Sequence, residues 1–101
     1  MKKKALQLKQ EGKLIEASKV ISEYYINNKA DSESLKIMSD IALASGNAAV
    51  SLAFFRKYQS SVLELTATEI AQFGGLLILN NQIEESKKVL EEGLKTFPND
   101  M

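Results

Sequence analysis

Apolar residues recur along the chain at the three- and four-residue spacing of amphipathic helices, and no alternating strand pattern competes with them. Thr66-Ala67-Thr68-Glu69 fits a capping box at the start of one helix, and Asn81-Gln82-Ile83-Glu84 fits a weaker one. Asp31 or Ser32 can cap another helix. The pattern predicts an all-α chain with helices at residues 2–11, 14–28, 33–45, 48–60, 67–80 and 83–96.

Three short reversals divide these helices into pairs at a nearly constant period. Gly46 follows Gly12 by 34 residues, and Asn81 follows Gly46 by 35 residues. Glycine and asparagine reach left-handed backbone conformations at the least cost, so each can end one helix and let the next one reverse. We therefore expect the three reversals at residues 12, 46 and 81.

Small and large side chains recur at matched offsets around the reversals. A small residue precedes each reversal by seven positions, another follows by five, and a large apolar residue follows by nine. Small residues allow two antiparallel helices to cross closely, and the large one fills the space beside the crossing. The spacing predicts a repeated helical hairpin. The residues at these three offsets are Ala5, Ser39 and Gly74; Ala17, Ser51 and Ser86; and Ile21, Phe55 and Leu90.

The pattern resembles the tetratricopeptide repeat (TPR), a unit of 34 residues with a small residue in the first helix, a glycine turn and an alanine early in the second helix. The resemblance covers nearly the whole chain. Only Pro98 matches the proline that closes each unit, and Met1, Leu35 and Ile70 replace the aromatic residue of the first helix. The resemblance implies a right-handed α-solenoid of three antiparallel helical hairpins. It would form a single TPR-like domain over residues 1–101, with repeats at about 1–31, 32–65 and 66–101.

Charge and composition narrow the classes of function. Thirteen basic and thirteen acidic side chains cancel, which argues against non-specific binding of nucleic acid or anionic membranes. The longest apolar run, Leu76 to Leu79, is far shorter than the roughly 20 residues of a membrane span, so we expect no membrane insertion. Residues 5–13 are too polar for an export signal, which favours a cytoplasmic location.

Catalytic and metal-binding chemistry has little support. The chain contains neither cysteine nor histidine, so disulfides, thiolate metal sites and the usual zinc ligands are excluded. Glu33, Asp40 and Glu69 are candidate acids, but without a paired group each is interpreted as an exposed charge. We expect no enzyme activity, no cofactor and no metal.

The resemblance also implies where a partner would bind, because the first helices of stacked hairpins line a concave face. This face would run from basic through mixed to apolar, which suits a protein or peptide with acidic residues at one end and apolar ones at the other. The carboxylate clamp of the chaperone-binding relatives does not fit, because residues 68–80 contain no lysine or arginine and Asp40 would repel a carboxylate. Scaffolds and chaperone-like adaptors are nearer. The expected lining is Lys2, Leu6, Lys9, Glu33, Lys36, Asp40, Leu43, Thr68, Ala71, Gly75, Ile78 and Leu79.

Two further groups of residues admit more than one interpretation. Gly75, unlike Gly74, is not explained by the repeat, and it either admits a ligand backbone or relieves crowding beneath the helix at 48–60. The aromatic residues of the second helices are interpreted as core, and the charged residues of the last helix as a solvated face. These sets are Tyr24, Tyr25, Phe54, Phe55 and Tyr58, and Glu84, Glu85, Lys87, Lys88, Glu91, Glu92 and Lys95.

An alternative function is a structural or self-assembling segment of a larger scaffold. Residues 1–30 hold seven lysines against three glutamates, whereas residues 66–101 hold three lysines against six acids. Opposite charges at the two ends would favour end-to-end contact between copies, giving a homo-oligomer, or would form two partner surfaces of opposite sign, or they are ordinary solvated helix surfaces. Three repeats are about the minimum for stability, so we also consider that the chain is part of a longer array.

Overall fold

Every regular element of the computed structural model is an α-helix within the residues that it describes, 2–29 and 31–96. The six predicted helices are confirmed, and each begins and ends within one residue of its expected position. Pro98 and Met1, used in the comparison with TPR units, lie outside the described residues. The helices are α1 (Lys2–Gln10), α2 (Leu14–Asn27), α3 (Ser32–Ala44), α4 (Ala48–Ser61), α5 (Ala67–Leu79) and α6 (Ile83–Thr96).

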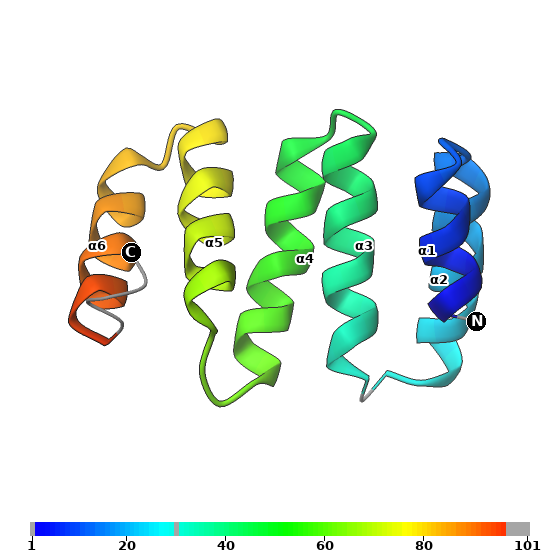
Figure 1. Ribbon diagram of the computed structural model, residues 1–101, viewed down its shortest axis with the longest axis horizontal. Helices are drawn as coiled ribbons and strands as arrows, with labels where there is room; N and C mark the ends of the chain where they lie inside the picture. The colour runs from blue at the N-terminus through cyan, green and yellow to red at the C-terminus, as the bar shows by residue number, and fades with distance from the viewer. Residues whose placement is uncertain (1, 30, 97–101) are drawn as a thin grey trace.

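The helices follow one another along the long axis of the molecule, which measures 38 × 26 × 21 Å. Figure 1 shows the α1–α2 pair at one end and α6 at the other, with successive helices reversing direction. The closest packing is within the pairs α1–α2, α3–α4 and α5–α6, and α2–α3, α4–α5 and α1–α3 also contact. The chain is therefore a repeat-like succession of helical pairs.

The three predicted reversals are confirmed and share one backbone geometry. Gly12, Gly46 and Asn81 have φ angles of +80°, +81° and +60°. At the first, the N–H groups of Gly12 and Lys13 bond to the carbonyls of Lys9 and Leu8 at 3.0 and 2.9 Å, and the other two reversals repeat this pairing. Two such bonds around a left-handed residue form a Schellman motif, which satisfies the last carbonyls of the helix and turns the chain back.

Helix starts are capped as local sequence predicts, with one exception. Asp31, rather than Ser32, caps α3 by accepting from the Glu33 N–H. Thr66 and Glu69 form the predicted capping box at α5. Asn81 does not start α6, because it occupies the left-handed position that ends α5.

The helices of each pair cross at the predicted small residues, with a different chemistry in each pair. In the first pair Ala5 and Ala17 are fully buried. In the second, the hydroxyls of Ser39 and Ser51 each donate to the other residue's carbonyl, at 2.8 and 2.7 Å. The third pair joins the Ser86 hydroxyl to the carbonyl of a glycine, Gly74, at 2.9 Å. Close backbone approach is thus common to all three pairs.

The core consists of two clusters along the molecule. One gathers Ile21 and the apolar residues of α1 and α3, and the other centres on Phe55, whose ring stacks on Phe73 at 5.3 Å. The interpretation of the aromatic residues as core is confirmed, since Phe55 is buried and the other four pack half-buried against these clusters. None of the helices in the described part of the chain is long and apolar enough to cross a membrane.

Candidate functional site

The twelve residues expected to line a binding face all lie on α1, α3 and α5, and none of them is buried. The structure brings four of them together around one cleft: Asp40, Leu43, Gly75 and Leu79. It does not bring the other eight into this cleft. Those eight are Lys2, Leu6, Lys9, Glu33, Lys36, Thr68, Ala71 and Ile78.

The cleft, which we name the α3–α5 cleft, lies between α3 and α5, whose backbones do not contact each other as those of α1 and α3 do. The helix α4 lies between them and supplies the floor with Ser51 and Phe55. The space has a volume of about 250 Å³ and is partly open to solvent. Its complete lining is Ser39, Asp40, Leu43, Ser51, Phe55, Gln72, Gly75, Leu76 and Leu79.

The two adjacent glycines of α5 face different surroundings. A Cβ placed on Gly74 would lie 2.8 Å from Cδ2 of Leu90, so a larger residue here would force the Leu90 side chain of α6 to shift. A Cβ on Gly75 would meet no atom within 4 Å. The interpretation that Gly75 relieves crowding beneath α4 is therefore wrong, because this position opens into the α3–α5 cleft.

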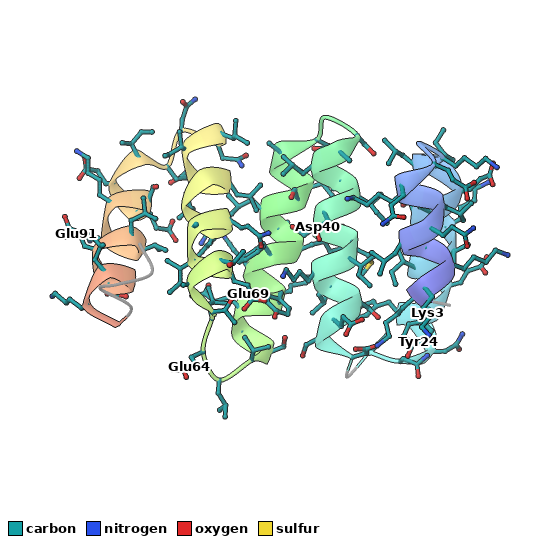
Figure 2. The ribbon with its side chains drawn as sticks, viewed as in Figure 1. Lys3, Tyr24, Asp40, Glu64, Glu69 and Glu91 are labelled. Atoms are coloured by element: carbon teal, nitrogen blue, oxygen red, sulfur yellow. The ribbon has the colours of Figure 1, made fainter. Side chains whose placement is uncertain are left out.

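Asp40 places a half-buried carboxylate at the edge of the cleft, near the middle of the molecule in Figure 2. Burial raises the pKa of Asp40 above its ordinary value, and the positive charges of Lys36 and Lys9 oppose that rise. Within residues 2–29 and 31–96, no hydrogen bond or ion pair reaches this carboxylate. The interpretation of Asp40 as a fully exposed charge is wrong, although it is accessible from the cleft.

The interpretation of Glu69 as an exposed charge is also wrong, because this residue is only 6% exposed. Its carboxylate accepts from the Thr66 N–H at 2.9 Å and from the Tyr58 hydroxyl, and it lies 3.3 Å from the Lys36 ammonium. Burial would raise the pKa of Glu69, but these donors and the lysine outweigh it and the pKa falls below its ordinary value. Burial beside this carboxylate raises the pKa of Tyr58 to about 12. Glu69 therefore joins three helices and is structural.

Two more ion-pair systems include charged residues that the sequence assigns to the binding face or to a solvated face. Lys2 lies 3.0 Å from Asp31 and 3.6 Å from the exposed Glu33. Arg56 of α4 forms two parallel bonds of 2.8 and 2.9 Å to the Glu85 carboxylate of α6. Glu85 thus differs from the other six residues expected to form a solvated face on α6, which are exposed as predicted.

Sequence reasoning missed five residues of the cleft lining: it assigned Ser39, Ser51 and Phe55 to the helix crossing, and it did not single out Gln72 or Leu76. Gln72 could have been found, because residues 72, 75 and 79 are spaced by three and four and so share one face of a helix. Leu76 is buried beneath that face. No group of three or more histidine, cysteine, aspartate or glutamate side chains in the described residues could hold a metal ion.

Comparison with known proteins identified no relative of the chain. No model of a known protein family matches the chain, and no curated protein matches it. A function must therefore be argued from the chemistry of the α3–α5 cleft itself.

Proposed function

We propose that the chain is a TPR-like right-handed α-solenoid of three hairpins that binds a peptide or protein segment in the α3–α5 cleft, without catalysis. The repeated Schellman reversals and the small-residue crossings support the solenoid, because each hairpin has the same construction. The packing of the helices supports a groove, since the backbones of α3 and α5 do not contact each other and a cleft lies between them.

The observation that supports binding best is the apolar rim of the cleft, which lies beside Gly75, a position where no side chain fills the space. Leu43 is 43% exposed and Leu79 is 61% exposed, on the two helices that flank the space. Burying such side chains is favourable by about 25 cal/mol per Å² of apolar surface. At Gly75 no side chain obstructs the approach of a ligand backbone. A partner could therefore bury apolar surface without displacing any residue of the cleft.

Recovery of bound proteins from an extract of the source cell tests this proposal. The chain is compared with Leu79→Asp, which places a charge in the rim, and with Leu63→Asp, the same change at a fully exposed leucine outside the cleft. We expect Leu79→Asp to lose partners that Leu63→Asp retains. Equal recovery by both variants would exclude the cleft. Lys36 is left unchanged, because its ion pair with Glu69 gives it a structural role.

Self-assembly is a second candidate function, supported by the opposite charges of the two ends. Figure 2 places Lys3 at the α1–α2 end and Glu91 at the α6 end, and both are exposed. Contact between these ends would weaken as salt screens the charges. The discriminating measurement is solution mass over a range of concentration and salt. A monomer of 11.2 kDa at every condition supports the binding module, and salt-sensitive association supports the scaffold.

A further inference from the structure

The α3–α5 cleft has room for one large apolar side chain. Its apolar lining comes from Leu43, Phe55, Leu76 and Leu79, on three different helices. An apolar cavity of about 150 Å³ holds benzene, so the 250 Å³ available here is enough for a leucine, methionine or phenylalanine side chain. The hydroxyls of the floor are already hydrogen-bonded to α3 and α4 backbone carbonyls, which leaves the apolar lining to determine what enters.

Asp40 adds a negative charge to the lining of the α3–α5 cleft. The charged groups that face it are Lys9 from α1 and Lys36 from α3 itself, while the residues of α4 and α5 that line the cleft are uncharged. Lys36 lies 3.3 Å from the Glu69 carboxylate, so its charge is largely compensated there. A half-buried carboxylate without a direct donor is stabilised by an incoming cation that can hydrogen-bond to it.

The basic part of the face offers less to an acidic ligand than the sequence alone indicates. Lys2 is paired with Asp31 and Glu33, and Lys36 with Glu69. These lysines would have to give up existing partners to bind an acidic segment. Among the residues that line the apolar space, the charge is the negative one of Asp40, which favours a basic ligand over an acidic one, although the Lys9 ammonium also faces this carboxylate from outside the lining.

We propose that the α3–α5 cleft recognises peptide segments in which a large apolar side chain stands close to a lysine or arginine. The apolar side chain enters the space beside Gly75, and the cation pairs with the carboxylate of Asp40. On the opposite side Gln72 presents an amide to the peptide backbone, since an amide both donates and accepts. This specificity rests on the proposed function, which requires only that the cleft binds a segment.

A library of random dodecamer peptides displayed on phage tests the inference with the intact chain. Selection is carried out on the chain itself, on Gly75→Leu, which fills the cleft, and on Gly75→Ala as its matched control. No atom lies within 4 Å of a Cβ at this position, so the first atom of the new side chain meets no clash, and circular dichroism verifies that the variant remains helical. We expect selected peptides to be enriched in lysine or arginine near a large apolar residue, and to bind Gly75→Leu at least tenfold more weakly.

A double-mutant cycle then tests the charge pair. The lysine or arginine of a selected peptide is replaced by glutamine, and Asp40 by asparagine, with Glu33→Gln as the control acid on the same helix. We expect each single change to weaken binding about tenfold, as for one partly desolvated charge pair, and the double change to cost little more than either one. Glu33→Gln should leave affinity unchanged.

The outcomes separate this inference from the proposed function. Peptides that are blocked by Gly75→Leu but show no basic enrichment, or that bind Asp40→Asn equally well, would overturn the inference and leave binding in the cleft intact. Selection of acidic peptides would overturn it in the same way. Peptides that bind Gly75→Leu as well as the unchanged chain, or no selectable peptide at all, would overturn both.

Discussion

Two neighbouring glycines of α5 have different surroundings: Gly74 packs against α6, whereas Gly75 is accessible from the α3–α5 cleft. Gly74 allows α6 to approach α5, because Leu90 occupies the space that a side chain would need. Gly75 is one residue further along the helix and meets open space in the α3–α5 cleft. A glycine in a helix interior costs about 1 kcal/mol relative to alanine, and packing offsets this cost only at Gly74.

Substitution by alanine should therefore change the free energy of unfolding in opposite directions at Gly74 and Gly75. Gly75→Ala should raise the free energy of unfolding by up to about 1 kcal/mol, through helix propensity alone. Gly74→Ala should lower it by about 1 to 2 kcal/mol, because Leu90 must shift from a contact of 2.8 Å. Urea unfolding of the two variants measures both changes. Equal effects would contradict the placement of these residues.

The ionised carboxylate of Asp40 should lower the stability of the fold at neutral pH. Its folded-state pKa is raised, chiefly by burial, so the ionised carboxylate destabilises the fold above that pKa. The penalty disappears as the pH falls and the carboxyl group protonates. Asp40→Asn should therefore gain up to about 0.5 kcal/mol near neutral pH and lose that advantage in acid. Thermal unfolding at the two pH values checks this, and a clear loss at neutral pH would mean that the carboxylate has a structural partner.

At the scale of the element, the start of α5 is held by contacts both within the helix and from outside it. The Thr66–Glu69 capping box is local and could be predicted from four residues. The Tyr58 hydroxyl and the Lys36 ammonium reach the same carboxylate from α4 and α3. Local sequence could not reveal these contacts, since they depend on how the helices pack. For this reason Glu69 was expected to be exposed.

Glu69→Gln should lower the free energy of unfolding by about 1 to 3 kcal/mol at neutral pH, since it weakens charge-assisted hydrogen bonds in a buried site. The folded-state pKa of Glu69 is lowered. Its contribution is thus present above the unfolded-state pKa and is lost as the pH falls through the folded one. The unchanged chain and the variant should converge in acid. Glu64→Gln, at an exposed glutamate in the preceding loop, is the control and should change little at any pH.

The crossing of α3 and α4 offers a test of the hairpin construction. Ser39→Ala removes the buried hydrogen bond that its hydroxyl donates to the Ser51 carbonyl, and should cost about 1 to 2 kcal/mol. The double change Ser39→Ala and Ser51→Ala reproduces the Ala5–Ala17 crossing of the first hairpin. It should therefore cost less than the sum of the two single changes. Simple additivity in chemical denaturation would show that the crossings are not equivalent.

In the molecule as a whole, the features that could be predicted from the sequence are those that depend on short-range patterns. Helix periodicity located all six helices, and Gly12, Gly46 and Asn81 located the reversals, because left-handed residues are a local requirement. Leu43 and Leu79, which the sequence assigns to one face of the first helices, are exposed.

The separation of the α3 and α5 backbones could not be predicted, because it depends on how one hairpin packs against the next. The same packing leaves Asp40 without a direct donor while it gives one to Glu69. A repeat pattern assigns both acids to first helices and contains no information that distinguishes them. The α3–α5 cleft is therefore a property of the junction between hairpins rather than of any one repeat.

Amide chemical-shift mapping of the ¹⁵N-labelled chain, titrated with a peptide from the displayed library, tests the central claim most directly. The account predicts that the largest shifts occur at Asp40, Leu43, Gly75 and Leu79, and that Ile15 and Leu63, which are exposed elsewhere, remain unchanged. Shifts concentrated around Ile15, or spread evenly over α2 and α6 with none at Gly75, would contradict binding in the α3–α5 cleft.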